Sequence, residues 1–498
     1  MNVNPITRLD YPDPDVIRVE DTYYMVSTTM HFMPGCEILQ SFDLVHWEHV
    51  TYVYETLDHT DAQQLKSGQN IYGQGMWAAS LRYHEGRFYI CFVANDTRKT
   101  YLYTSEKIDG PWKKQLIEGF YHDGSLLFDE DGRSYIVYGN DEIWITELNE
   151  DLTAPKKDGL HRLLVSDHKN PELGYEGSHI QKINGYYYIF LVHSLRDRWM
   201  RTEACFYSDS LEGEFTGGDV LCDDRGYCGQ GVAQGGIVDT PDGKWYAMLF
   251  QDSGAVGRIP ILLPVTWKDH FPIFGQNGHV PEEIEVHSTR PGYIYQPLVG
   301  SDDFCNGLLP RWQFNHDPDP RYYHLDALQG TYTITTREVC TELTQAVNTL
   351  TQRMSYPSCA AEVTVDASAL KEGDVAGLCA LQGCYAAVGI TKHHGKYEVL
   401  MLDKKEDGIL DMTEGTVVES HQMDFRLEAD FCNMKDEAHC YYRVNKGDWL
   451  PIGTVHKLYF KLDHFTGCRF GLFCYAAEET GGSACFRDFK YYDVDEIS

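Results

Sequence analysis

Residues 184–190, Asn-Gly-Tyr-Tyr-Tyr-Ile-Phe, are one copy of a phrase that occurs five times in the first half of the chain. Each copy joins a turn residue pair to an aromatic pair and then to an apolar run. The other copies begin at residues 20, 85, 131 and 242. Turns centred on Gly or Asp that lead into aromatic and β-branched runs are typical of β-hairpins. The phrase therefore predicts five hairpins.

The spacing of the copies indicates how the hairpins are arranged. The last tyrosine of the aromatic pair, or its equivalent, stands at positions 24, 89, 135, 188 and 246. A four-stranded blade with its loops fits these intervals, and radial repetition of blades makes a propeller. Helical periodicity is scarce. We therefore predict an all-β fold that begins with a five-bladed β-propeller over residues 1–298.

The second half of the chain has a different pattern. The five-fold phrase stops near Pro281, and residues 282–300 contain the breakers Pro291-Gly292 and Pro297, which predict a linker. Short strand-like segments separated by turns follow. They predict a β-sandwich over residues 301–498.

Counting back from the five marker positions gives candidate site residues. Positions eleven or twelve residues upstream are Asp13, Trp77 with Ala78, Asp123, Glu176 and Gln234. The first strand of each blade lines the axis of a propeller, so these positions should meet at one mouth of the central tunnel. Because burying three carboxylates together destabilises a protein unless something uses them, the set predicts a functional site.

Two kinds of site use clustered carboxylates. Calcium takes six to eight oxygen ligands, often several from one loop, whereas here each of three blades supplies a single acid. Glycoside hydrolysis uses two carboxyl groups whose pKa values are kept apart, and a third nearby charge can keep the acid protonated. The pattern favours a glycoside hydrolase over a cation site.

Composition excludes several classes of partner. The formal net charge of −33 repels nucleic acid and anionic membranes. No apolar stretch approaches the ~20 residues that cross a bilayer, and the N-terminus has no charged segment followed by an apolar one. The 15 cysteines include no C-x-x-C pair, which argues against a disulfide framework or a zinc site. We expect a cytoplasmic protein.

The motifs resemble those of glycoside hydrolase family 43, in its two-domain β-xylosidase and α-L-arabinofuranosidase branch. The similar phrases are residues 11–14 (Tyr-Pro-Asp-Pro), 76–83, 122–126, 176–180 and 234–245. They occur in the family's order, and phrases in the second half resemble its jelly-roll, concanavalin-like second domain. That domain is expected to pack on the propeller and help close the pocket.

The resemblance implies a role for each acid. Asp13 falls on the general base that deprotonates the attacking water, and Glu176 falls on the general acid. Asp123 falls on the third acid, which orients Glu176 and raises its pKa. The resemblance also implies inversion of the anomeric configuration, and Arg258 falls on an arginine that binds sugar hydroxyls.

Phe32, Trp77 and Gln234 are the remaining candidate site residues. Phe32 and Trp77 are predicted to wall the sugar pocket. Gln234 stands where much of the family has a histidine associated with an axial water or calcium ion. Because a neutral amide is a poorer anchor for a cation, we count Gln234 with the substrate-binding residues and assign no metal ligand. No cofactor is expected for catalysis, and a structural calcium ion in the second domain is an expectation without assigned ligands.

The sequence thus predicts an exo-acting, inverting hydrolase that releases terminal xylose from β-1,4-xylo-oligosaccharides and also acts on α-L-arabinofuranosides. Two alternatives stay open: a retaining, fructan-cleaving propeller enzyme with a similar sandwich, and a sugar-binding propeller without activity. The expected partner is a xylo- or arabino-oligosaccharide, with no nucleic acid and no membrane. A homo-oligomer is left open.

Overall fold

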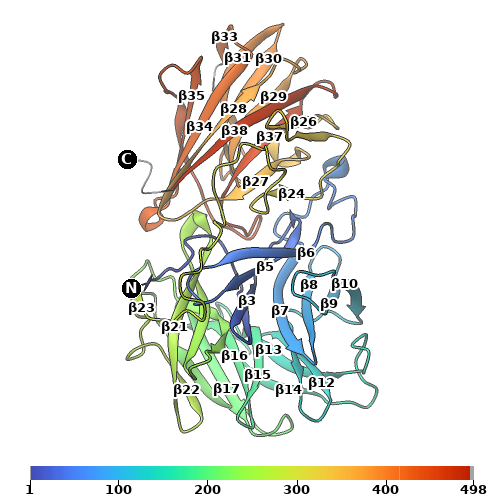
Figure 1. Ribbon diagram of the computed structural model, residues 1–498, viewed down its shortest axis with the longest axis vertical. Helices are drawn as coiled ribbons and strands as arrows, with labels where there is room; N and C mark the ends of the chain where they lie inside the picture. Colours follow the sequence, from blue (N-terminus) through green and yellow to red (C-terminus); the bar gives the residue numbers. More distant parts are fainter. Residues whose placement is uncertain (1, 414, 494–498) are drawn as a thin grey trace.

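The computed structural model describes residues 2–413 and 415–493 as two β-domains stacked end to end (Figure 1). The described residues contain no α-helix and four short 3₁₀ turns: η1 (Lys66–Gly68), η2 (Gly254–Val256), η3 (Leu343–Gln345) and η4 (Cys432–Met434). None of these turns is long and apolar enough to cross a membrane. All 15 cysteines are free thiols.

Five four-stranded antiparallel sheets, each built from consecutive strands, form the lower domain in Figure 1. Blade 1 is β2 (Asp15–Val19), β3 (Thr22–Val26), β5 (Gly35–Ser41) and β6 (Glu48–Tyr54), and blade 2 is β7 (Met76–His84), β8 (Arg87–Ala94), β9 (Lys99–Ser105) and β10 (Lys113–Ile117). Blade 3 is β11 (Ser125–Phe128), β12 (Ser134–Asn140), β13 (Glu142–Leu148) and β14 (His161–Ser166). Blade 4 is β15 (Glu176–Ile183), β16 (Tyr186–Ser194), β17 (Arg201–Ser208) and β18 (Thr216–Leu221), and blade 5 is β19 (Val232–Asp239), β20 (Trp245–Asp252), β21 (Arg258–Lys268) and β22 (Phe271–Phe274). The predicted five-bladed propeller is confirmed, and the five marker positions lie on the second strands.

The ring of blades is closed by the start of the chain. Strand β1 (Asn2–Val3) pairs with β23 (Glu283–Ile284), which follows blade 5. The side-chain amide of Asn4 donates to the Leu262 carbonyl at 2.7 Å and accepts from the Leu262 amide at 3.1 Å. These contacts fasten the N-terminus, and with it the segment that carries Asp13, to blade 5.

Polar contacts also join the inner strands around the axis. The buried carboxylate of Asp15 on β2 accepts hydrogen bonds from the Leu81 amide at 2.7 Å and from Arg82 at 2.8 Å. Its other oxygen lies 3.1 Å from Nδ1 of His179 on β15. Three blades are thereby fixed relative to one another immediately behind the tunnel mouth.

The upper domain is a sandwich of two antiparallel sheets. One sheet contains β24 (Gln313–Asn315), β27 (Leu350–Arg353), β29 (Asp374–Leu381), β30 (Ala386–His393), β31 (Lys396–Lys404), β32 (Leu410–Met412), β33 (Thr416–Val418) and β37 (Arg469–Ala476). The other contains β25 (Tyr323–Asp326), β26 (Thr331–Thr335), β28 (Ser358–Asp366), β34 (Gln422–Asp430), β35 (Glu437–Val444), β36 (Leu450–Lys457) and β38 (Ser483–Asp493). Phe425, Phe470 and Leu472 are fully buried in the core between them.

The two domains share backbone pairing. Strand β4 (Phe32–Met33) leaves blade 1 and completes the first sandwich sheet, where Met33 pairs with Phe314 on β24. Next to this joint, a buried ion pair of 2.9 Å links Arg353 of the sandwich to Glu37 of blade 1. The propeller and the sandwich therefore meet through an ordered interface, and the cavity described below lies against it.

Candidate active site

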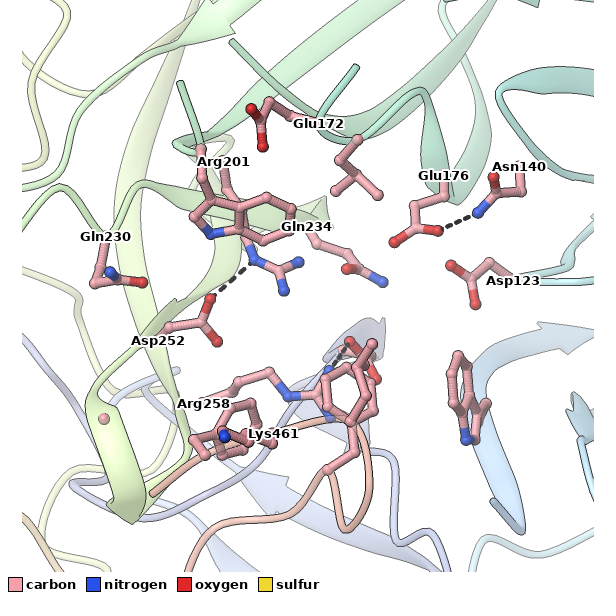
Figure 2. Close-up of a pocket in the computed structure, with 18 of the residues that line it drawn as sticks. Asp123, Asn140, Glu172, Glu176, Arg201, Gln230, Gln234, Asp252, Arg258 and Lys461 are labelled. Atoms are coloured by element: carbon pink, nitrogen blue, oxygen red, sulfur yellow. Dashed lines mark hydrogen bonds and ion pairs between the residues drawn. The ribbon is translucent and has the colours of Figure 1, made fainter. Parts of the chain in front are cut away.

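The five positions predicted from the repeat meet at one cavity. Its volume is about 600 Å³. Its lining includes one predicted residue from each blade: Asp13, Trp77, Asp123, Glu176 and Gln234. Figure 2 shows the side chains of Asp123, Glu176 and Gln234 pointing into the same space. The structure therefore brings the three predicted carboxylates together.

Two local features of the backbone turn these side chains toward the tunnel mouth. Asp13 and Asp123 each stand two residues before the first strand of a blade, with positive φ angles of 53° and 47°. Aspartate tolerates this left-handed conformation better than most residues. In β7, β15 and β19 the pairing register shifts at Trp77, Glu176 and Ala233, as in a β-bulge. Bulges re-aim side chains next to functional sites.

Asp13 is nine-tenths buried and held on both carboxylate oxygens. Oδ1 accepts a hydrogen bond from Nη1 of Arg258 at 3.0 Å, and Oδ2 accepts one from the Thr28 hydroxyl at 2.5 Å. These bonds fix the plane of the carboxylate at the cavity wall. Such fixing matters for chemistry, because a misplacement of about 1 Å can lower a rate roughly a hundredfold.

Glu176 and Asp123 form a second group with His122. Glu176 Oε2 accepts from the Asn140 side chain at 2.6 Å (Figure 2). The same oxygen lies 3.4 Å from His122 Nε2. Asp123 Oδ2 accepts from the Gly177 amide at 3.0 Å and lies 3.6 Å from the same imidazole nitrogen. His122 is not among the predicted site residues, although it directly precedes Asp123 in the sequence.

The pKa values of Asp123 and His122 are strongly shifted. Burial raises the pKa of Asp123 to about 6; the charge of His122 opposes the shift, and the charges of Glu176 and Asp13 add to it. Burial lowers the pKa of His122, but the carboxylates of Asp123 and Glu176 outweigh burial and raise that pKa to about 9. Near neutral pH the group therefore contains an imidazolium between two carboxyl groups.

Arg258 presents unused hydrogen-bond donors at the cavity. Its side chain is buried, and only Nη1 is engaged, with Asp13. Nε and Nη2 have no hydrogen-bond partner among the residues that the structure describes. Buried donors are nearly always paired, so these two are suited to oxygen atoms of a bound ligand. The centre of the Phe465 ring lies 4.3 Å from the guanidinium carbon of Arg258.

The sandwich supplies part of the cavity wall, as the resemblance implied. Met434, Phe460, Lys461, Leu462 and Phe465 all line it. The Phe465 ring centre lies 5.4 Å from that of Trp77, so aromatic rings from the two domains face each other. Both domains therefore contribute aromatic side chains to the wall of one cavity.

Phe32 is placed elsewhere than predicted. It is fully buried, it is not among the lining residues, and its ring lies 3.4 Å from the guanidinium carbon of Arg469. The reason is its strand: β4 turns away from the tunnel mouth to pair with β24 of the sandwich. Phe32 therefore belongs to the domain interface rather than to the wall of the cavity.

The outer part of the cavity has residues that the sequence analysis missed. Arg201, at the start of β17, donates to Asp252 at 3.0 Å and packs its guanidinium 5.3 Å from the ring centre of Trp199 (Figure 2). Glu172 and Gln230 complete this side. They come from loops and from second and third strands, so the offset from the marker tyrosines could not reach them.

The comparisons with known proteins agree with this architecture. Residues 3–272 match the model of glycosyl hydrolases family 43, and residues 301–492 match that of the β-xylosidase C-terminal concanavalin A-like domain. A β-xylosidase of Formosa agariphila is 27% identical over 99% of this chain and 89% of its own length. A xylosidase/arabinosidase of Butyrivibrio fibrisolvens is 23% identical over 99% of both chains.

A solved structure of a related protein has the same two-domain fold. A bifunctional GH43-CE protein of Bacteroides eggerthii superposes with a TM-score of 0.93 at 42% identity, over all of this chain. The chain spans 64% of the length of that longer protein. The family match and the fold confirm the resemblance drawn from the motifs. The chain belongs to family 43 of the glycosyl hydrolases.

Proposed function

We propose that the protein is an exo-acting, inverting glycosidase that releases terminal xylose from β-1,4-xylo-oligosaccharides and also cleaves α-L-arabinofuranosides. One observation carries the proposal: Asp13, Glu176 and Asp123 line a single cavity that the sandwich domain helps to enclose. The names of the relatives support the two sugars. The paired carboxylates fit an active hydrolase better than a sugar-binding protein.

In this mechanism Asp13 acts as the general base. The hydrogen bonds from Arg258 and Thr28 orient its carboxylate toward the water that attacks the anomeric carbon. The carboxylate takes one proton from that water while the new carbon–oxygen bond forms. Arg258 directs its remaining donors at the sugar, so one side chain fixes both the base and the substrate.

Glu176 acts as the general acid. It gives its proton to the glycosidic oxygen as the bond to the anomeric carbon breaks, and Asn140 orients it. Burial and the charge of Glu176 raise the pKa of Asp123 to about 6, so one proton stays on Asp123, beside the acid, to a higher pH than on an isolated aspartate. Asp123 therefore acts by holding this proton beside Glu176 and by bonding to Gly177, which follows the acid.

The stereochemistry of the product tests this mechanism. Inversion requires water between base and acid, which are then about 6.5–9.5 Å apart. With nitrophenyl β-D-xyloside, proton NMR should show α-xylose as the first product, followed by mutarotation. If β-xylose appears first, the retaining, fructan-type alternative is favoured. If no sugar is released from either the xyloside or the α-L-arabinofuranoside, the protein is a binder or acts on another glycoside.

The charge on His122 should set the basic limb of the pH profile. The imidazolium favours loss of the proton from the Asp123–Glu176 pair, and this cation is present below its pKa of about 9. Replacing it by a neutral side chain in His122→Gln should let the pair keep its proton to higher pH. We expect the basic limb of kcat/KM to move up by about 1 to 3 pH units. An unchanged limb would show that His122 does not influence the acid.

The sandwich should also position Arg258. Asp436 accepts from the Ala255 amide at 3.1 Å, within the η2 turn that ends just before Arg258. Burial raises the pKa of Asp436 to about 6, so a neutral amide is a fair substitute. Asp436→Ala leaves the Ala255 amide unpaired, which costs about 1–3 kcal/mol, and should lower kcat/KM about tenfold, because Arg258 holds both the base Asp13 and the sugar. Asp436→Asn is the matched control and should stay near wild type.

The other expectations concern cofactors, a calcium ion, location and partners. Family 43 glycosidases need no catalytic cofactor. A structural calcium ion in the sandwich stays a prediction. Among the described residues of the sandwich, no three carboxylate or imidazole side chains lie close enough together to bind one ion. The cytoplasmic location and any homo-oligomer likewise stay predictions. The net charge of −33 supports the expectation that nucleic acid is not a partner.

A further inference from the structure

His122, Asp123 and Glu176 form a compact group of metal-ligand side chains. His122 Nε2 lies 3.4 Å from Glu176 Oε2 and 3.6 Å from Asp123 Oδ2. The ligand atoms of the three residues all lie within 4.8 Å of one another, and no other group of three such side chains among residues 2–413 and 415–493 does so. The group therefore stands out from the many ordinary His–carboxylate contacts of this acidic protein.

The distances match a tetrahedral ion. Zinc binds imidazole nitrogen and carboxylate oxygen at about 2.0–2.2 Å, which in a tetrahedron places neighbouring ligand atoms about 3.3–3.6 Å apart. The two measured separations from His122 fall at this edge length. The third edge, between the two carboxylates, is at most 4.8 Å. A small rotation of the partly exposed Glu176 side chain would close it.

The donors and their surroundings also suit zinc. One nitrogen and two carboxylate oxygens are borderline ligands, whereas calcium takes six to eight oxygens. Asn140 and the Gly177 amide already orient the two carboxylates, as outer partners do in metal sites. The cavity side of the group is open, which leaves a fourth position for water, the arrangement of open zinc sites.

The charge balance of the cavity favours a cation there. Five acids line it, Asp13, Asp123, Glu172, Glu176 and Asp252, against the three cations Arg201, Arg258 and Lys461. Both arginines are matched by carboxylates outside the group: Arg258 pairs with Asp13 and Arg201 pairs with Asp252. Lys461 pairs with Glu406. Among the described residues, His122 is the one basic side chain that forms close ion pairs with both Asp123 and Glu176.

We propose that these three residues form an inhibitory zinc site. The ion is held between His122 Nε2 and the two carboxylate oxygens, and any proton on these ligand atoms is released to solvent when it binds. With the ion bound, Glu176 is a ligand and has no proton to give to a glycosidic oxygen. Zinc binding itself is independent of the proposed function, whereas the inhibition rests on it.

Calorimetric titration of the full chain with zinc chloride tests the binding. The wild type should bind one zinc ion. The affinity of His122→Gln for zinc should be more than about 100-fold weaker, because the loss of even an outer partner of a ligand weakens a metal site 10- to 100-fold. His324→Gln, at an exposed histidine on β25, is the matched control and should bind like the wild type. Equal zinc affinity in wild type and His122→Gln would overturn the proposal.

A second variant and a second metal sharpen the result. Glu176→Gln removes an anionic ligand with almost no change in shape, so it should also lose the zinc ion while its thermal unfolding stays that of wild type. Calcium chloride should give no binding that depends on His122. Either a zinc ion retained by Glu176→Gln or His122-dependent calcium binding would contradict the assignment.

Activity assays then separate the two claims. If nitrophenyl β-D-xyloside is a substrate, zinc should inhibit the wild type competitively, EDTA should reverse the inhibition, and His122→Gln should resist it. Zinc inhibition that is not competitive would overturn the inhibitory role. If the wild type hydrolyses neither glycoside, the proposed function fails, but the calorimetric comparison still decides whether the zinc site exists.

Discussion

Replacing Asp13 by asparagine should lower kcat/KM for nitrophenyl β-D-xyloside by about 10²–10⁴-fold, the usual contribution of a positioned general base. An amide has nearly the same shape and keeps an acceptor for one of the two neighbours, Arg258 or Thr28. It cannot take a proton from water. The loss should therefore appear mainly in kcat, with the fold intact by circular dichroism.

A matched control separates the role of Asp13 from a general effect of Asp→Asn changes. Asp131 lies in an exposed turn of blade 3, and Asp131→Asn should keep wild-type rates. If Asp13→Asn kept more than a tenth of the wild-type kcat, another group would have to be the base. Because the nitrophenyl leaving group needs little protonation, the assay isolates the attack of water from the action of the acid.

Replacing Glu176 by glutamine should give a loss that depends on the leaving group. Xylobiose leaves as a poor alkoxide and needs a proton, so its hydrolysis should fall about 10²–10⁴-fold. Nitrophenyl β-D-xyloside leaves as a stabilised phenolate, and its hydrolysis should fall far less. The ratio of the two losses, measured by sugar analysis and by absorbance, reports acid catalysis directly.

Glu172 offers the control for this second prediction, because it is another glutamate of the same cavity. Glu172→Gln should affect both substrates alike. Equal losses for xylobiose and the nitrophenyl glycoside in Glu176→Gln would mean that Glu176 binds or orients the substrate, and another acid would have to be found.

The repeated phrase predicted most of the fold because each copy forms a hairpin from residues that are neighbours in the sequence. A turn pair followed by aromatic residues, as at Gly185 and Tyr186, makes a hairpin from neighbouring residues. Five hairpins at similar intervals along the chain can form a closed ring of blades, whatever the conformations of the loops between them. The same regularity placed Asp13, Asp123 and Glu176 at one mouth, since each keeps nearly the same distance from its marker tyrosine.

The residues that escaped prediction depend on contacts between distant segments. Phe465 reaches the cavity only because the sandwich docks on the propeller, and Phe32 leaves the cavity wall because β4 joins β24. Arg201 acquires its position through Asp252, which lies on another blade. His122 could have been found from its position next to Asp123, but its ring matters only because Glu176 of the next blade faces it.

The pairing of Met33 with Phe314 bears on how the chain matures during synthesis. Strand β4 is made early, yet the strand that it pairs with emerges some 280 residues later, about 15–60 s at 5–20 residues per second. Throughout that interval the backbone groups of β4 lack the strand with which they pair, and unpaired strands readily pair with other chains. The nascent protein is therefore most vulnerable to aggregation after its propeller has formed, and slower translation of the second half should worsen it.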